Sequence, residues 1–202
     1  MRIRQHVNPL RSDFLEIPLE PLNLVRERPV EVELGSAEAQ FLMERAAEDP
    51  ERNYVGVEIR RELVEQSNRR CRQVGLVQVH SVFANITVDL PRLFAPAAVS
   101  RFFINFPDPW FKQRQRKRRV VSDELILQLD QLLARDGEIH VVTDIFDIAL
   151  DAMAALEQAS CFRNLCDPWG FLRVSRFLAR SRRERHCEEL GIKIWRLAYG
   201  RQ

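Results

Sequence analysis

Residues 30–59 read VEVELGSAEAQFLMERAAEDPERNYVGVEI, and this stretch decides the fold class. Short apolar runs at residues 30–34 and 53–59 are typical of buried strands, whereas residues 37–48 carry apolar side chains at helical spacing. A strand, a helix and a second strand in this order predict two parallel strands joined by a crossover helix.

The same alternation continues along the chain. Further strands are predicted at residues 76–82, 99–106, 138–143 and 192–197, and further helices at residues 60–73, around an apolar stripe at 125–133, at 145–156 and at 177–190. Gly137 is expected to end the helix that precedes residue 138. The predicted fold is α/β, a Rossmann-like, doubly wound and mostly parallel sheet in three layers.

The chain has 202 residues, which is enough for one domain with a core of its own. We expect residues 1–202 to form a single domain, with residues 1–29 as an N-terminal arm, because four prolines interrupt that stretch. Hydrophobic residues make up 46% and charged residues 30% of the chain, which excludes a disordered or low-complexity protein.

Compartment and metal content are inferred from what the sequence lacks. No apolar run reaches the roughly 18 to 20 residues that span a bilayer, and the N-terminus lacks the apolar segment of a secretory signal. The four cysteines contain no C-x-x-C pair, so we expect reduced thiols and no structural zinc site. These features favour a cytoplasmic protein that binds no membrane and no metal.

Ligands of doubly wound sheets bind beyond the carboxyl ends of the strands, where this sequence places several polar residues. Glu33 and Gly35 follow the first strand, and the single glycine there argues against a pyrophosphate-binding loop. Glu58 ends the second strand, where it is either a ribose ligand or a solvated surface residue. Asn85 follows the third strand, and an Asx turn or helix cap is its alternative role.

Residues 105–112, NFPDPWFK, follow the fourth predicted strand. Two prolines fix the backbone on both sides of Asp108. A carboxylate held in this way at the end of a buried strand favours a functional role over a simple turn with a packed tryptophan. Asp108 is therefore the candidate catalytic residue.

Two clusters of basic residues indicate a polyanionic partner. Residues 112–119, KQRQRKRR, contain six basic side chains, and without them the formal net charge of +2 would become −4. A second cluster consists of Arg173, Arg176, Arg180, Arg182, Arg183 and Arg185. Because the first cluster directly follows the Asp108 turn and Trp110, the sequence favours an RNA with an unstacked base at this site.

In this order and spacing, the motifs resemble the bacterial tRNA (guanine-N7)-methyltransferases. The resemblance begins with residues 4–10, RQHVNPL, and its most specific part is residues 105–112 with the basic run behind them. Glu33 with Gly35, and residues 56–58 (GVE), resemble the two S-adenosylmethionine (SAM) motifs of the family. Residues 143–144 (TD) and the pair Ser181 and Glu184 resemble its later motifs, although Ser181 replaces a threonine and residues 35–39 (GSAEA) contain fewer glycines than usual.

The resemblance implies a class I methyltransferase fold, SAM as the cofactor and transfer of its methyl group to guanine N7 of tRNA, at position 46 of the variable loop. It assigns cofactor binding to Glu33, Gly35, Glu58, Asn85 and Asp108, the last of which is also the catalytic residue. It assigns substrate binding to Lys112, Asp144, Ser181 and Glu184. The RNA backbone is expected to contact Arg114, Arg116, Lys117, Arg118 and Arg119.

Three alternatives remain open at the level of sequence. Ser181 and Glu184 could be an ordinary S-x-x-E sequence inside a helix. The chain could be an RNA-binding module on a methyltransferase fold without turnover, which the glycine-poor loop would favour. It could also methylate another nucleic-acid base, although the acid between two prolines argues against that. The expected partner is tRNA, and the chain is either a monomer or a homodimer.

Overall fold

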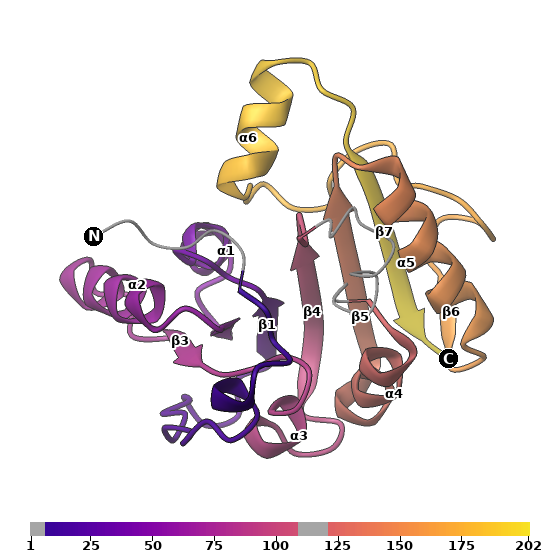
Figure 1. Cartoon of the computed structure of the whole chain (residues 1–202). Coiled ribbons are helices and arrows are strands. Elements are labelled where there is room, and N and C mark those ends of the chain that lie inside the picture. The colour runs from indigo at the N-terminus through magenta and orange to yellow at the C-terminus, as the bar shows by residue number, and fades with distance from the viewer. Residues whose placement is uncertain (1–6, 109–120) are drawn as a thin grey trace.

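The computed structural model describes residues 7–108 and 121–202, and in these parts of the chain seven strands form one mixed sheet (Figure 1). The strands are β1 (Val30–Leu34), β2 (Asn53–Glu58), β3 (Val79–Phe83), β4 (Val99–Asn105), β5 (Leu133–Thr143), β6 (Phe162–Asn164) and β7 (Trp195–Arg201). Their order in the sheet is β3-β2-β1-β4-β5-β7-β6. The strands β1 to β5 are parallel, whereas β7 pairs antiparallel with both β5 and β6.

Helices cover both faces of the sheet, which confirms the predicted three-layer α/β fold. The helical elements are η1 (Ser12–Phe14), α1 (Gln40–Glu48), α2 (Arg61–Gln73), α3 (Leu90–Leu93), α4 (Asp123–Leu132), α5 (Phe146–Gln158) and α6 (Arg182–Glu189). One core cluster contains buried residues of α3, α4 and α5, and a second cluster contains those of α1 and α2. Figure 1 shows α6 beyond the carboxyl ends of β4 and β5.

The central strand β4 contributes side chains to both core clusters. Phe102 and Ile104 pack in the cluster under α4 and α5, whereas Phe103 packs with α1 on the other face. Full burial of such a side chain stabilises the fold by about 1.5–3 kcal/mol. The strand therefore holds its carboxyl end, where the NFPD sequence begins, in a fixed position.

Gly137 does not end the preceding helix, which corrects the prediction. The helix α4 ends at Leu132, and β5 begins at the next residue. The strand then bulges, because Val99 pairs with Leu133 while Arg101 already pairs with Glu138. Within this bulge a Cβ on Gly137 would lie 2.6 Å from Leu133 Cγ, so glycine is required there by close packing.

Two helices begin three or more residues later than predicted. Ala37 and Ala39 have φ values of 46° and 52°, so α1 begins only at Gln40. The basic helix begins at Arg182 instead of residue 177, because the Ser181 hydroxyl caps it by accepting from the Glu184 backbone N–H at 3.1 Å. The last strand correspondingly lies at Trp195–Arg201 instead of residues 192–197, and β6 was not predicted.

The described part of the predicted N-terminal arm, residues 7–29, contains one short helical turn, η1. It is nevertheless held against the sheet. Ile17 is 1% exposed, and the Asn53 side chain exchanges hydrogen bonds with the Val25 backbone, donating at 2.9 Å and accepting at 2.9 Å.

Candidate functional site

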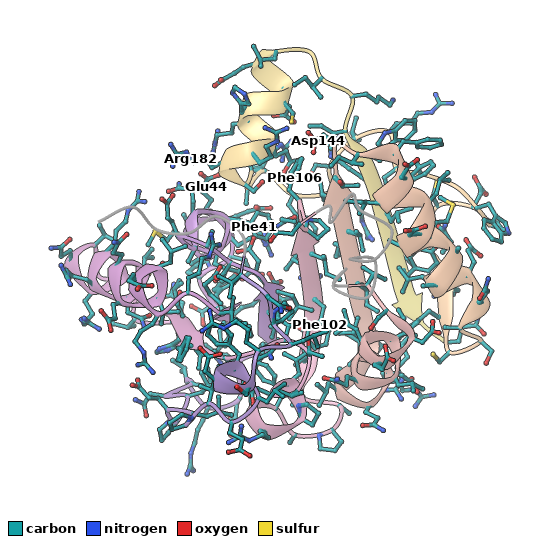
Figure 2. All side chains as sticks on the ribbon, in the orientation of Figure 1. Phe41, Glu44, Phe102, Phe106, Asp144 and Arg182 are labelled. Atoms are coloured by element: carbon teal, nitrogen blue, oxygen red, sulfur yellow. The ribbon has the colours of Figure 1, made fainter. Side chains whose placement is uncertain are left out.

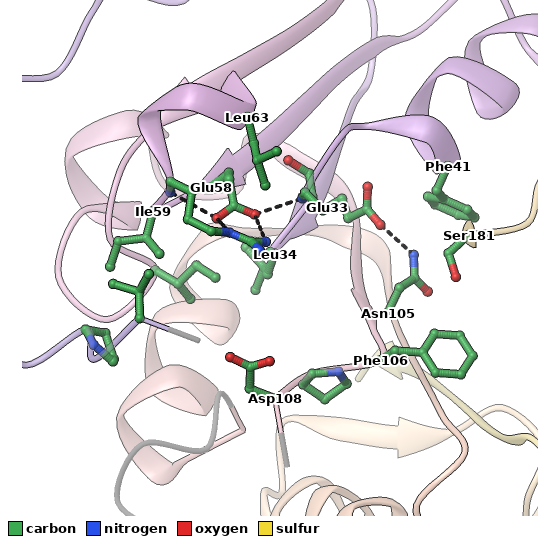
Figure 3. A pocket seen from close by; sticks show the side chains of 18 of the residues that line it. Glu33, Leu34, Phe41, Glu58, Ile59, Leu63, Asn105, Phe106, Asp108 and Ser181 are labelled. Atoms are coloured by element: carbon green, nitrogen blue, oxygen red, sulfur yellow. Dashed lines mark hydrogen bonds and ion pairs between the residues drawn. The ribbon is translucent and has the colours of Figure 1, made fainter. Parts of the chain in front are cut away.

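A cavity of about 940 Å³ lies at the carboxyl ends of β1, β2 and β4. Its lining includes residues that follow the strands β1 to β4, together with three more distant segments at residues 7–10, 122–125 and 181–186. Of the predicted site residues that the structure describes, the lining includes Glu33, Gly35, Glu58, Asn85, Asp108 and Ser181. Side chains expected at separate strand ends therefore meet around one space (Figure 3).

Backbone hydrogen bonds hold the beginning of the loop after β1 in place. The N–H groups of Gly35 and Ser36 both donate to the Val57 carbonyl, at 2.9 and 3.3 Å. Gly35 has φ +84°, a conformation that glycine adopts without cost. Ala37 and Ala39 also have positive φ, so the loop keeps a glycine-like shape without glycine at these two positions.

Gly56 on β2 lets the loop after β1 pack closely, because glycine has no side chain at this position. A Cβ at this position would lie 2.4 Å from Ser36 Oγ and 2.7 Å from Ser36 Cβ. The glycine of the GVE sequence is thus required by the close approach of the neighbouring loop, a reason that sequence alone does not reveal.

Glu58 is 2% exposed and its carboxylate accepts several hydrogen bonds. Ala37 N–H donates to Oε2 at 2.8 Å, which ties the loop after β1 to the end of β2. Arg60 donates from its backbone N–H, from Nε and from Nη2, at 3.0, 2.8 and 2.9 Å. Glu58 is therefore not a solvated surface residue but an ion-paired group in the cavity wall (Figure 3).

The Glu33 carboxyl group is buried, and only one of its two oxygens accepts a hydrogen bond. Asn105 Nδ2 donates to Glu33 Oε1 at 2.9 Å, while Oε2 is buried without a hydrogen-bond partner in the described structure. Burial raises the pKa of Glu33 to about 8, the Asn105 hydrogen bond opposes this shift, and the Glu58 charge adds to it. The side chain can thus serve a cationic or hydrogen-bond-donating group of a ligand.

Asp108 reaches the cavity from a strained turn. Phe106 has φ 48°, which is unusual for a bulky residue, and its N–H donates to the Val142 carbonyl at 2.7 Å. In Figure 3 the Phe106 ring points away from Asp108, whose carboxylate is turned toward the Glu58 side. The charge of Asp108 contributes to raising the pKa of Arg60, after the larger effects of the Glu58 hydrogen bond and charge.

Asn85 lines the cavity but holds the protein chain with its side chain. Its Nδ2 donates to the carbonyls of Pro9 and Phe14, at 2.9 and 3.0 Å, and its Oδ1 accepts from Thr87 N–H at 3.0 Å. The last contact is an Asx turn, the alternative that the sequence left open. The two donors of the amide are thus engaged by the N-terminal segment.

Of the predicted substrate-binding residues that the structure describes, some line the cavity and others do not. Asp144 lies outside the cavity lining and pairs with Arg183 at 2.5 Å, and Arg183 does line the cavity. The Glu184 carboxylate is buried and accepts from Arg196 Nε and Nη2, at 3.1 and 2.8 Å. Of the pair Ser181 and Glu184, the structure brings only Ser181 to the cavity wall.

The second basic cluster is largely neutralised by carboxylates. Four of its arginines pair with acids from other parts of the fold: Arg176 with Glu138, Arg182 with Glu38, Arg183 with Asp144 and Arg185 with Glu44. Arg180 pairs with Glu188 of α6 at 3.1 Å. Figure 2 shows Glu44 and Asp144 on either side of the beginning of α6.

The first basic cluster cannot be placed. Lys112, Arg114, Arg116, Lys117, Arg118 and Arg119 lie outside the described residues, as do Pro109 and Trp110. Among residues 7–108 and 121–202 there is no cluster of three or more metal-ligating side chains. No helix in these ranges has the length and apolar character needed to cross a membrane.

Sequence reasoning missed four contributors to the site: Asn105, Arg60, Arg183 as a cavity residue, and the segment at residues 7–10. Asn105 had a usable signal, because it is a polar residue at the end of an apolar strand. The segment lies within the family motif at residues 4–10, but its place at the cavity could not be predicted from spacing, because the contact between Pro9 and Asn85 spans 76 residues.

Comparisons with known proteins agree with this architecture. A family model described as "Putative methyltransferase" matches residues 27–197. The tRNA (guanine-N(7)-)-methyltransferase of Synechococcus sp. (strain JA-3-3Ab) is 38% identical over 201 residues, which cover 96% of this chain and 84% of the relative. The enzyme of the same name from Thermosynechococcus vestitus is 34% identical over 205 residues and covers 100% of this chain and 95% of its own.

Solved structures share the fold at low sequence identity. A SAM-dependent methyltransferase from Aquifex aeolicus has a TM-score of 0.58 at 9% identity, with 86% of this chain and 81% of that chain covered. The aminoglycoside resistance methyltransferase NpmB1 has a TM-score of 0.54 at 17% identity, with 90% and 95% covered.

Proposed function

The chain belongs to the tRNA (guanine-N(7)-)-methyltransferase family, and on this premise we propose that it methylates N7 of a guanine in tRNA with SAM as the methyl donor. The observation that supports the proposal is that Glu33, Glu58 and Asp108 line the same cavity. The family-implied target, guanine 46 of the variable loop, is part of the proposal.

The residues present in the cavity fit the cofactor. Glu33 offers a buried carboxylate oxygen without a partner, which suits the cationic methionine part. Glu58 is proposed to accept from the ribose hydroxyls, which would share its carboxylate oxygens with Arg60. Ile59 and Ile86 also line the cavity and offer apolar side chains that a purine ring could contact. When bound, SAM supplies an electrophilic methyl group.

Asp108 is the proposed catalytic residue. Guanine N7 carries a lone pair and no proton, so the reaction needs no general base at that atom. The Asp108 carboxylate can accept from guanine N1–H and from the 2-amino group, which adenine cannot offer in the same arrangement. Its negative charge also favours a purine that becomes positive as the methyl group arrives.

Other residues are proposed to hold the nucleotide. Ser181 lines the cavity, where its hydroxyl is proposed to contact the nucleotide. Asp144 is proposed to act indirectly, by orienting Arg183, which does line the cavity. Glu184 is proposed to act indirectly, through its hydrogen bond with Arg196 of β7. Lys112 and the arginines at 114, 116, 118 and 119, with Lys117, are proposed to bind phosphates. A cytoplasmic location, a single domain and a monomeric or homodimeric state complete the proposal.

Methyl transfer from labelled SAM to unmodified tRNA transcripts, followed by nucleoside analysis, tests the function. Label in 7-methylguanosine is expected. Label in another nucleoside would assign a different base, and bound tRNA without label would favour an RNA-binding module.

The variant Asp108→Asn tests the catalytic role. Turnover should fall by at least about 100-fold, in the range that charge stabilisation of a transition state supplies, while tRNA binding is kept. Asp136→Asn is the matched control, because Asp136 is exposed in the β5 bulge. Lost tRNA binding with normal single-turnover chemistry would contradict the assignment.

A further inference from the structure

The two ends of the chain contribute side chains of opposite charge to the cavity. The strands β1, β2 and β4 and the turns after them contribute four acids, Glu33, Glu38, Glu58 and Asp108. The segment at residues 181–186 contributes basic side chains, Arg182, Arg183 and His186. The acids suit a cationic cofactor, whereas the basic side chains suit the phosphates of an RNA.

An ion pair between Arg182 and Glu38 joins these two sets of residues. Arg182 is the first residue of α6, and Glu38 lies in the loop after β1, with 3.3 Å between Arg182 Nη1 and Glu38 Oε2. The partners are 144 residues apart in the chain, and both line the cavity. Figure 2 shows Arg182 beside the beginning of α6. The pair therefore lies where cofactor loop and substrate side meet.

This pair is more exposed than three other pairs that tie the second basic cluster to acids outside α6. The side chains of Arg182 and Glu38 are 84% and 46% exposed. The acids that pair with Arg176, Arg183 and Arg185 are only between 13% and 21% exposed. Water and salt screen an exposed pair, so it stabilises the fold little. Arg182 can thus change its partner at a lower cost than the other three arginines.

Glu38 keeps a cationic neighbour when Arg182 leaves it. The pKa of Arg60 is raised first by its hydrogen bond with Glu58 and, to a smaller degree, by the charges of Glu58, Asp108 and Glu38. Glu38 is also in contact with solvent, since nearly half of its side chain is exposed. Separation of the pair therefore leaves no buried, uncompensated charge.

We propose that Arg182 binds a phosphate of the tRNA next to the target nucleotide, and that Glu38 is the carboxylate from which Arg182 separates to do so. The inference rests on the proposed function, because it takes the cavity as the site of methyl transfer. A guanidinium group donates two parallel hydrogen bonds to a phosphate, which is a stronger contact than a screened surface pair. In the unbound protein Glu38 therefore competes with tRNA for Arg182.

Equilibrium binding of a labelled, unmodified tRNA transcript in saturating S-adenosylhomocysteine tests the two roles. Arg182→Gln is expected to raise the Kd about fivefold and to lower the slope of log Kd against log salt concentration by about one, as for the loss of one phosphate contact. Glu38→Gln is expected to lower the Kd about threefold, because the competing ion pair is gone.

The double variant separates competition for Arg182 from general repulsion between Glu38 and RNA. Once Arg182 is glutamine, the further change Glu38→Gln should alter the Kd less than about twofold, because the two residues act as a unit. General repulsion would lower the Kd by the same factor with or without Arg182. Arg69→Gln and Glu65→Gln, at exposed positions on α2 outside the cavity lining, are the matched controls and should leave the Kd as it is.

An unchanged Kd in Arg182→Gln, or an equal gain from Glu38→Gln in both backgrounds, would overturn the inference. Methyl transfer by the unchanged protein is measured on the same samples. If tRNA were bound but not methylated, the proposed function would be wrong, while the Kd values of the variants would still decide whether Arg182 contacts a phosphate. If the unchanged protein bound no tRNA, both would be wrong.

Discussion

Asn105 at the end of β4 donates to Glu33 at the end of β1, at 2.9 Å, and holds a buried carboxylate beside the cavity. The bond joins two neighbouring parallel strands at their carboxyl ends and satisfies only one carboxylate oxygen. Ionising a carboxyl group that is 3% exposed and has only one oxygen hydrogen-bonded is costly in the folded protein, and this cost is measurable.

The ligand-free protein should lose stability as the pH rises from about 4.5 to about 8. In the unfolded chain Glu33 releases its proton near pH 4.5, whereas burial keeps it protonated in the folded protein up to about pH 8. Between these values the free energy of unfolding should fall by about 1.4 kcal/mol per pH unit from this group. Urea denaturation at several pH values measures the slope.

Glu33→Gln is expected to flatten that slope, because glutamine stays neutral in both states. Glu65→Gln, at an exposed position on α2, serves as the control and should leave the slope as it is. If the free energy of unfolding depended on pH with the same slope in the unchanged protein and in Glu33→Gln, other groups would be responsible for the pH dependence.

Ala37→Gly should stabilise the loop after β1. Ala37 has φ 46°, where a Cβ costs about 1 kcal/mol relative to glycine. The midpoint of thermal unfolding should therefore rise by about 2–4 °C for a chain of this size. The reverse change at Gly35, φ +84°, should lower it, since no neighbouring atom lies within 4 Å to complicate the comparison. A lower midpoint for Ala37→Gly would contradict this account.

Gly56→Ala should destabilise the protein mainly through Ser36, because the other close neighbour, Leu42 Cδ1, would lie 3.3 Å from the new Cβ. The new Cβ would meet Ser36 at 2.4 and 2.7 Å, and overpacking of this kind costs about 1–3 kcal/mol. The double variant Gly56→Ala with Ser36→Gly removes both clashing atoms and should recover most of the loss. Chemical denaturation of the single and double variants measures the coupling, and strictly additive losses would count against the packing explanation.

Glu44→Ala should weaken tRNA binding without changing affinity for the cofactor. Glu44 on α1 accepts from the Arg180 backbone N–H at 3.0 Å and pairs with Arg185 at 2.5 Å, so it positions the turn that carries Ser181. Partial burial raises the pKa of Glu44, but the hydrogen bonds from Arg180, Gln40 and Arg185 and the Arg185 charge outweigh it and lower this pKa below its ordinary value.

The expected loss in tRNA affinity is about 1 kcal/mol, or roughly fivefold in KM, because the pair is partly exposed. Glu65→Ala makes the same charge change on α2 and should leave KM for tRNA unaltered. A cofactor Kd that shifts as much as the tRNA KM would show that Glu44 supports the fold in general.

The sequence predicted most of the architecture because the spacing of apolar residues within each segment shows which side chains will be buried. The apolar run of β4 and the helical stripes of α4 and α5 each follow a period that neighbouring residues reveal. The bulge in β5 was not predictable in this way, since it results from the pairing of Val99 and Arg101 with a distant strand. The start of α6 was displaced by a local cap at Ser181 together with the contacts of Arg180.

By itself the sequence determined the alternation of strands β1 to β5 with the helices α1, α2, α4 and α5, and it placed Glu33, Glu58 and Asp108 at strand ends that a parallel sheet brings together. Only the tertiary structure decided which arginines of the second basic cluster are paired with carboxylates and which remain available to bind a ligand. Arg185 pairs with Glu44 across 141 residues and Arg183 with Asp144 across 39, so a cluster counted as six positive charges is mostly neutralised. Ion pairs form between side chains that the fold brings close, and sequence spacing does not encode that distance.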